Sequence, residues 1–525
     1  MARQRLTVFS KLLITILIVG AIVYAGYYLL NNTSLGQELK QQSQTQSSNQ
    51  TSNTQPSDDA SDEILKVQIL PWGGFAPGLY YNGGLSASEN SRFYTEQGIR
   101  VEFVIIDDFP SARQAWKVDE IPVMANTADG VLLEFDGIKD DNPEIFLQTD
   151  WSRGGDVIIA RRGINSINDL RGQKVAVTPN TPSMTYLVMA LNTANMKLSD
   201  IQVVESPDNP TAATIFNSGS VDAAVVWSPS HFESLEVVKG SSILQSTRDA
   251  AYALAGIFYA KRDYIDRNID LFQAFYEGWM IAAAEINSNE DNRLAAATIV
   301  AETFDLPTDD AMGMMYDAYL CTHGDNINYF GLSNNFSGIT GSQLHQTTAN
   351  LLVTQQLISP QIPNFRSIIN TKAASRTTLS DPVHAGEESV SFEPASEAEI
   401  AAPALSSKPV SINFQTGSAT LSENAKTIID LQFADIAKTY AASRIRIEGN
   451  TDNVGARDMN MRLSQSRAQA VSSYLQSEYD IDPNRFIIVG NGPDKPVSGC
   501  EDNASASCRA QNRRTDFQLV AAGTN

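Results

Sequence analysis

The chain is poor in residues that hold metals or act as thiol nucleophiles. It has three cysteines and four histidines among 525 residues. His231, His323, His345 and His384 are scattered, and none stands with a cysteine at metal-ligand spacing. We therefore expect no metal site, no bound cofactor and no cysteine–histidine catalytic pair. No nucleophile, base and orienting group occur together at a recognisable spacing either, so we expect no enzyme.

Basic residues are also scarce. The sequence has 38 Lys and Arg against 60 Asp and Glu, a net charge of −22, and it has no Lys/Arg-rich run. Binding to nucleic acid needs a concentrated positive surface, so nucleic acid is not an expected partner. At 42% hydrophobic and 19% charged residues the composition is that of a globular protein, and the length predicts about three domains.

The first thirty residues contain a long apolar stretch without charge. Leu12 to Leu30 is nineteen residues long, close to the roughly 20 that span a bilayer core. Three basic residues precede it, so the positive-inside rule places residues 1–11 in the cytoplasm and the bulk of the chain in the periplasm. We expect a single-pass inner-membrane anchor at 12–30. The alternative is a signal peptide cleaved near Ala25, which would give a periplasmic protein.

Two polar segments divide the exported part. Fifteen of the sixteen residues at 41–56 are Gln, Ser, Thr or Asn, so we expect a disordered linker at 31–63. Residues 371–408 are rich in Ala, Ser, Glu and Pro with weak hydrophobic periodicity, and we expect a second flexible linker there. Two globular segments remain, at 64–370 and 409–525.

The first globular segment alternates strand-like and helix-like stretches, which predicts parallel α/β construction. The strand-like runs are 65–70, 101–106, 157–160, 174–178 and 222–227. Open α/β sheets bind ligands at the carboxyl ends of their strands. The candidate ligand-binding residues at those ends are Trp72, Phe75, Thr127, Asp129, Thr181, Ser183 and Trp227.

Each candidate also has a structural interpretation. The two tryptophans either stack on a ligand or pack in the core. Asp129 either pairs with a cationic group or serves as a turn residue. Thr181 and Ser183 either donate to an anion or cap the next helix.

Three stretches of this segment carry a family resemblance. Residues 170–177 (LRGQKVAV), 181–183 (TPS) and 219–229 (GSVDAAVVWSP) resemble ABC-transporter substrate-binding proteins of the nitrate, sulfonate and taurine type. The resemblance implies a two-lobed, periplasmic-binding-protein-like α/β domain that closes on a small-molecule ligand by hinge motion, with an ABC permease as candidate partner. Fungal thiamine-pyrimidine synthases share this scaffold and are enzymes, but their cysteine-rich iron motif has no counterpart here.

The C-terminal segment predicts a small α+β domain. We expect strands at 410–414, 444–448, 485–490 and 515–520, and helices at 422–441 and 457–479. The first helix has Ser422 as N-cap and Leu431, Ile436 and Ala437 on its inward face.

Three motifs of this segment closely resemble the OmpA-like peptidoglycan-binding domain. They are 449–455 (GNTDNVG), 460–471 (NMRLSQSRAQAV) and 509–514 (RAQNRR). The resemblance implies that the partner is peptidoglycan, through the diaminopimelate residue of its stem peptide. The sequence departs from the family's pattern at two places: Asn450 stands where the family usually has His, and residues 415–418 replace its commoner acidic turn.

Diaminopimelate presents an ammonium and a carboxylate, so its receptor needs a fixed anion and a bidentate cation. Asp452 is expected to supply the first and the planar guanidinium of Arg467 the second, and the resemblance gives these positions those roles. Asn460 lies two helical turns before Arg467 on the same face and is expected to shape the pocket wall. Arg514 is a further candidate, and we expect one of the two residues Arg513 and Arg514 to face the pocket. The alternative is a structural Asp–Arg pair without a ligand.

Cys500 and Cys508 have seven residues between them and precede the last strand. In an exported domain we expect them to form a disulfide. Taken together, the sequence predicts a Gram-negative envelope protein: a membrane-anchored solute-binding protein tethered to peptidoglycan and serving ABC-type uptake of a small molecule. The alternatives are a ligand sensor, or a structural envelope tether without a transport role.

Overall fold

The computed structural model of the protein describes residues 63–523, apart from Asn334, Asn335, Ser337, Ser389, Asn413 and Thr416. The predicted cytoplasmic segment, the predicted membrane helix and nearly all of the first predicted linker lie outside the described residues. Within the described part, no helix combines the length and apolar character needed to cross a membrane.

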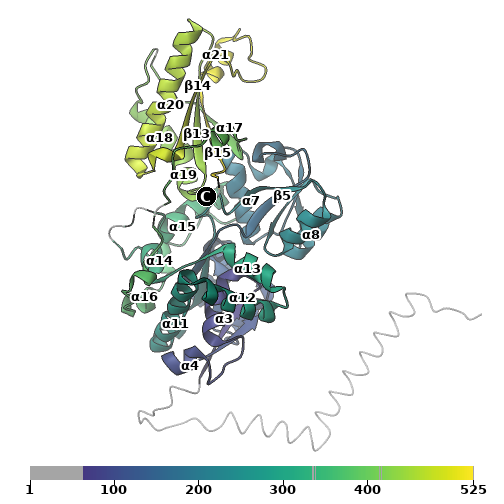
Figure 1. Cartoon of the computed structure of the whole chain (residues 1–525), viewed down its shortest axis with the longest axis vertical. Coiled ribbons are helices and arrows are strands. Elements are labelled where there is room, and N and C mark those ends of the chain that lie inside the picture. The colour runs from purple at the N-terminus through teal and green to yellow at the C-terminus, as the bar shows by residue number, and fades with distance from the viewer. Residues whose placement is uncertain are drawn as a thin grey trace, which may run out of the picture. The chain divides into compact units, whose positions relative to one another are not determined.

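The first lobe is built on a six-stranded sheet in the order β11-β4-β10-β3-β1-β2. The strands are β1 (Ile64–Ile69), β2 (Arg100–Ile105), β3 (Val123–Thr127), β4 (Pro143–Ser152), β10 (Ala255–Lys261) and β11 (Ala318–Leu320). The helices between and after them are α3 (Ala76–Asn82), α4 (Arg92–Gln97), α5 (Phe109–Lys117), α6 (Ala128–Ile138), α10 (Arg262–Arg267), α11 (Ile269–Ser288), α12 (Glu290–Phe304), α13 (Thr308–Tyr316), α14 (His323–Tyr329) and α15 (Gly341–Thr354). Helices α3, α11 and α12 pack against one another (Figure 1).

The second lobe has a five-stranded sheet in the order β7-β6-β8-β5-β9. Its strands are β5 (Asp156–Ala160), β6 (Lys174–Val177), β7 (Gln202–Glu205), β8 (Ala223–Trp227) and β9 (Ser242–Ser246), and its helices are α7 (Pro182–Thr193), α8 (Asn209–Asn217) and α9 (Ser230–Val237). The chain passes from the first sheet to the second between β4 and β5 and returns between β9 and β10. The predicted two-lobed architecture is therefore present.

The prediction of parallel sheets is only partly correct. β1 pairs in parallel with β2 and β3, and β6 with β7 and β8. The strands at the two crossovers run antiparallel to their neighbours: β5 to β8 and β9, and β10 to β3 and β4. β5 and β10 enter their sheets directly from a strand of the other lobe, so they do not belong to the strand–helix–strand units that join parallel neighbours within one sheet.

The C-terminal domain has a four-stranded sheet in the order β12-β15-β13-β14. Its strands are β12 (Ser406–Val410), β13 (Arg444–Asn450), β14 (Phe486–Gly492) and β15 (Thr515–Val520), and its helices are α18 (Glu423–Ile429), α19 (Asp435–Thr439), α20 (Arg457–Tyr479) and α21 (Ala506–Asn512). The predictions for α20 and β15 are confirmed. The first strand was predicted four residues too late, because an edge strand such as β12 tolerates Pro409 within it.

The helix after Ser422 differs from the expected pattern at one position. Ser422 accepts a hydrogen bond from the Ala425 amide, as predicted for an N-cap, and Ile436 and Ala437 are buried. Leu431 is 78% exposed, contrary to prediction. It lies in a π-helical turn, Asp430–Ala434, whose extra residue changes the direction of the side chains relative to an α-helix.

Residues 371–408 also differ from the expected flexible linker. They include the short helices α16 (Lys372–Arg376) and α17 (Glu397–Ala401). Ion pairs hold them to the first lobe: Lys372 to Asp266 at 2.6 Å, and Glu387 to Arg153 through two bonds of 2.6 and 2.9 Å. Composition alone did not reveal these partners because they lie far away in the sequence.

Candidate functional site

A cleft of about 570 Å³, part of it open to solvent, lies where the two lobes meet. Four of the predicted ligand-binding residues line it: Trp72, Phe75, Thr127 and Trp227. Trp72 and Phe75 follow β1, Thr127 ends β3, and Trp227 ends β8 of the second lobe. Strand ends from both sheets thus supply aromatic surface to one cavity.

Asp150, on β4, forms part of the cleft wall together with Trp72. The indole Nε1 of Trp72 donates to Asp150 Oδ2 at 3.0 Å, and the Thr149 hydroxyl donates to Oδ1 at 2.7 Å. Two glycines make room for this carboxylate: a Cβ on Gly74 or Gly256 would lie 2.1 or 2.2 Å from Oδ1. The position of Asp150 therefore depends on the absence of side chains on both neighbours.

Asp156 begins β5, directly after the first crossover, and pairs in register with Trp227. The Ser152 hydroxyl donates to its Oδ2 at 2.7 Å and lies 2.8 Å from the Thr247 hydroxyl, which belongs to the return crossover. A Cβ on Gly155 would lie 2.1 Å from the ring of Trp72. The two cleft carboxylates therefore lie close to either end of the crossover between the lobes.

Both carboxylates are shielded from water. Burial, together with the smaller effect of the nearby charges of Asp129, Asp150 and Asp317, raises the pKa of Asp156 to about 7, against the opposing effect of its hydrogen bond from Ser152. Burial raises the pKa of Asp150 to about 6, against the opposing effect of its hydrogen bonds from Thr149 and Trp72. Near neutral pH the cleft therefore contains carboxyl groups that titrate.

This titration predicts the pH dependence of stability. A raised pKa means that the folded state holds the Asp156 proton more tightly than the unfolded state, so its contribution to stability falls as pH rises from about 4 to about 7. Replacing Asp156 by Asn, which still accepts from Ser152, is expected to stabilise the protein at pH 8 by about 1 to 3 kcal/mol. At pH 4 the difference should vanish. Thermal unfolding across this range measures it, and a variant less stable than wild type at pH 8 would contradict the interpretation.

Three other predicted residues do not line this cavity. Asp129 is buried in the first turn of α6, where burial raises its pKa. Ser183 is fully buried in α7. Thr181 occupies the N-cap position of α7, but its hydroxyl donates to the Thr178 carbonyl at 2.8 Å and caps nothing. Thr181 lines an adjoining hollow that shares Trp227 and Phe109 with the cleft.

Asp150 and Asp156 were missed in the sequence. The feature that could have identified them is an aspartate within a strand that is buried along its whole length. All ten residues of β4 and all five of β5 are buried. Carboxylates are rarely buried without a partner, so such positions deserve attention as functional candidates.

A second cluster surrounds Asp452 in the C-terminal domain. Its Oδ2 accepts from Arg513 Nη1 at 2.6 Å, and its Oδ1 accepts from the Val454 amide at 3.1 Å. The Asn460 amide donates to the Val454 carbonyl at 3.1 Å. Asn460 thus holds the loop that carries Asp452 against α20.

Arg467 comes to this cluster from α20. Its Nε donates to the Ser418 carbonyl at 3.1 Å, and its guanidinium lies 4.9 Å from the ring centre of Phe414. Burial lowers its pKa, and the positive charge of Arg513 lowers it further. Among the described residues no hydrogen bond joins Arg467 to Asp452, so the carboxylate pairs with Arg513 instead.

Arg514 is not at this cluster, and this corrects its choice as a site residue. Its guanidinium contacts Asp516 through bonds of 3.0 and 2.9 Å, and its side chain is 14% exposed. Arg513, with 48% of its side chain exposed, faces Asp452. Successive residues entering a strand point to opposite sides, so only one of the pair reaches the site.

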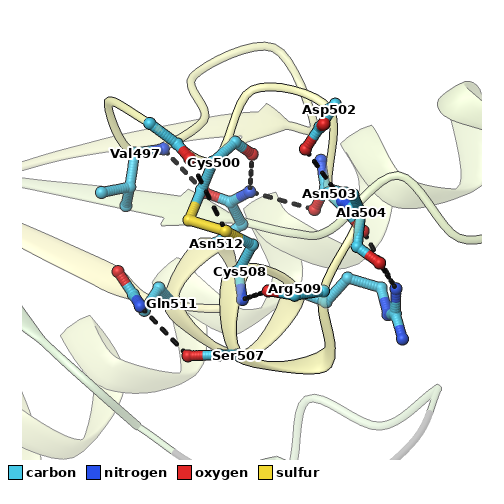
Figure 2. The surroundings of a disulfide bond; sticks show 12 residues. Val497, Cys500, Asp502, Asn503, Ala504, Ser507, Cys508, Arg509, Gln511 and Asn512 are labelled. Carbon is cyan, nitrogen blue, oxygen red and sulfur yellow. Dashed lines mark hydrogen bonds between the residues drawn. A yellow bond between two sulfur atoms is a disulfide. The ribbon is translucent and has the colours of Figure 1, made fainter.

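The disulfide between Cys500 and Cys508 is present, as predicted. Figure 2 shows how Asn512 joins the same loop: its Oδ1 accepts from the Val497 amide at 2.7 Å, and its Nδ2 donates to the Cys500 carbonyl at 2.9 Å. Asn512 is fully buried and directly precedes Arg513. The loop is therefore tied down next to the residue that faces Asp452.

Removing this disulfide is expected to lower stability. Replacing Cys500 and Cys508 by Ser frees a loop of about nine residues, which costs roughly 2 to 3 kcal/mol in the chain-entropy account. Thermal unfolding of the variant should match that of the reduced wild-type protein, and reductant should not affect the variant. A wild-type protein whose unfolding is insensitive to reduction would contradict this expectation.

Comparisons with known proteins match both globular segments. Residues 413–513 match the OmpA family, and residues 152–291 match the NMT1/THI5 like family. The predicted combination of a binding-protein domain with an OmpA-like domain is confirmed.

Individual relatives match one part each. The peptidoglycan-associated lipoprotein of Rhizobium meliloti is 37% identical over 113 residues, 22% of this chain and 61% of that protein. A putative binding protein of Brucella abortus is 40% identical over 74 residues, 14% of this chain and 23% of that protein. The first curated relatives are matched over only 30% to 53% of their own length.

Among solved structures, the periplasmic aliphatic sulphonate binding protein SsuA from Escherichia coli aligns with a TM-score of 0.47 at 19% identity. The alignment covers 59% of this chain and 98% of that chain.

Proposed function

We propose that this protein is an exported solute receptor whose C-terminal domain holds it on peptidoglycan. The observation that carries the proposal is the cluster of Asp452, Arg467 and Arg513 in a domain that matches the OmpA family. The solute-binding part of the proposal is supported by the two-lobed domain, which has a cleft where its lobes meet.

Recognition of diaminopimelate follows from the charges of this cluster. The carboxylate of Asp452 pairs with the ligand ammonium, and the guanidinium of Arg467, which within the described residues is bound to two carbonyl oxygens, receives the ligand carboxylate. Arg513 pairs with Asp452 through an ion pair whose cation is half-exposed, so water around the guanidinium weakens the attraction. Exchanging that pair for the ligand therefore costs little.

The position in the envelope follows from the N-terminal sequence. Leu12–Leu30 anchors the chain in the inner membrane, and the polar residues after it form the tether that lets the C-terminal domain reach the wall. Cleavage near Ala25 would instead leave the protein free in the periplasm, held by the wall alone. In both cases the two globular domains act outside the cytoplasm and perform no catalysis.

The binding-protein domain is proposed to serve ABC-type uptake of its solute. Its two crossovers lie next to each other and are joined by the Ser152–Thr247 contact, which is the arrangement of a hinge between lobes. Solute held between Trp72 and Trp227 contacts both lobes and so favours closure.

Co-sedimentation with purified sacculi tests the proposal. The full chain is expected to pellet with diaminopimelate-type sacculi and to be released by an excess of soluble diaminopimelate-containing stem peptide. A chain that stays in the supernatant at every concentration, while remaining folded by circular dichroism, would refute the wall-binding half.

A further inference from the structure

We propose that the interlobe cleft takes a small organic ammonium cation. The inference rests on the proposed solute-binding function and names the chemical class of the solute. It depends on three features of the cleft: the sign of its charge, its aromatic walls and a carboxylate oxygen that no protein donor reaches.

The charge of the cleft is negative. Among the described residues that line it, Asp150 and Asp156 are the charged ones, and no Lys, Arg or His accompanies them. The adjoining hollow has four carboxylates, those of Asp107, Asp108, Glu134 and Asp208, against Arg113 alone, which pairs with Glu134 at 2.9 Å. An anion entering this cleft meets carboxylates and no free cationic side chain among these lining residues.

Aromatic rings line the same space. Trp72 and Phe75 come from the first lobe, Phe109 from the start of α5, and Trp227 from the second lobe. The faces of such rings attract ammonium groups, by about 2 kcal/mol or more when water is excluded. Carboxylates with aromatic walls together favour an organic cation over a bare metal ion, whose ligands would be oxygen-rich and close together.

Asp156 offers an available acceptor in this setting. The residue is 6% exposed and lines the cleft. Its Oδ2 accepts from Ser152, whereas its Oδ1 receives no hydrogen bond within the described part of the chain. Both oxygens of Asp150 are already engaged, by Trp72 and Thr149. A carboxylate oxygen without a protein donor, on a residue that lines a cavity, is suited to a ligand ammonium.

The surrounding charges set a pH dependence. Asp129, Asp150 and Asp317 lie close enough to Asp156 for their charges to raise its pKa, and Arg248 lies 3.5 Å from Asp317. Burial raises the pKa of Asp156 to about 7. A bound cation favours the ionised carboxylate, so binding should release protons and tighten as pH rises, by roughly tenfold between pH 5.5 and pH 8.

The test measures thermal shift and calorimetric affinity of the full chain with choline and other small quaternary and primary ammonium compounds. The neutral isostere 3,3-dimethylbutan-1-ol, ethanesulfonate and nitrate are the comparison probes. We expect at least one ammonium compound to bind, the isostere to bind at least about tenfold more weakly, and the two anions to have no effect.

Two variants locate the binding. Asp156→Asn, which keeps the shape of the side chain, is expected to weaken ammonium binding about tenfold and to flatten its pH dependence. Asp309→Asn, which removes an exposed carboxylate of α13 away from the cleft, should leave affinity unchanged.

The outcomes separate this inference from the proposed function. Binding of ethanesulfonate or nitrate without binding of any ammonium compound would overturn the cation class and leave the solute-receptor function standing. No binding of any probe by a folded chain would overturn the inference, while wall binding is judged separately by sacculus sedimentation. Ammonium binding that Asp156→Asn does not weaken would also overturn it.

Discussion

Replacing Asp452 by Ala is expected to reduce peptidoglycan binding by at least about 100-fold. The substitution removes the only carboxylate that contacts Arg513 in the described structure, and with it the proposed partner of the ligand ammonium. A buried or half-buried charge left without its partner costs about 2 to 5 kcal/mol in a complex, which corresponds to this loss. Sedimentation of the full chain with sacculi over a range of concentrations measures the change.

Two further variants sharpen this test. Asp458→Ala removes an exposed carboxylate from the first turn of α20, six residues away, and should sediment like wild type. Arg467→Lys keeps the charge but loses the bidentate geometry, so its binding should fall about tenfold or more. If Asp452→Ala sedimented as well as wild type, the cluster would be structural and the proposed recognition wrong.

Replacing Gly449 by Ala is expected to destabilise the C-terminal domain by about 3 kcal/mol or more. A Cβ at this position, on β13, would lie 2.1 Å from the backbone carbonyl oxygen of Ser464 on α20. The Ser464 atoms that this Cβ would meet belong to the backbone, so the clash cannot be relieved without shifting the helix or the strand. Because α20 also carries Arg467, the same substitution should displace that side chain and weaken wall binding.

Hydrogen exchange of the peptides that span α20, together with thermal unfolding, measures this effect. Gly137→Ala is the matched control, since a Cβ there meets no atom within 4 Å and alanine favours a helix. The control should be as stable as wild type. A Gly449→Ala protein with unchanged protection of α20 would show that the strand and helix are not packed at backbone distance.

The sequence predicted the C-terminal site well where its motifs are continuous. The helix at 457–479 and the strand at 515–520 have the expected bounds, and Asp452, Asn460 and Arg467 come to one region. The choice between Arg513 and Arg514 was not decidable from sequence, because it depends on where β15 begins and hence on which residue faces the loop.

The interlobe cleft was predicted less completely, for a physical reason. Trp72 and Trp227 stand at strand ends, which a sequence pattern reveals. Asp150 and Asp156 are recognisable as site residues only in the structure, because the crossover between the two sheets brings their carboxylates close to each other. Partners distant in the sequence also explain why the pairing of Arg153 with Glu387 was not foreseen.

Titrating the full chain with a stem tripeptide that ends in diaminopimelate, and with its counterpart that ends in lysine, tests the central claim most directly. Lysine keeps the side-chain ammonium but lacks the carboxylate that Arg467 is proposed to receive. The account predicts saturable binding of the diaminopimelate peptide, at least about tenfold tighter than the lysine peptide, and lost in Asp452→Ala. Equal affinity for the two peptides, or binding that survives in Asp452→Ala, would contradict it.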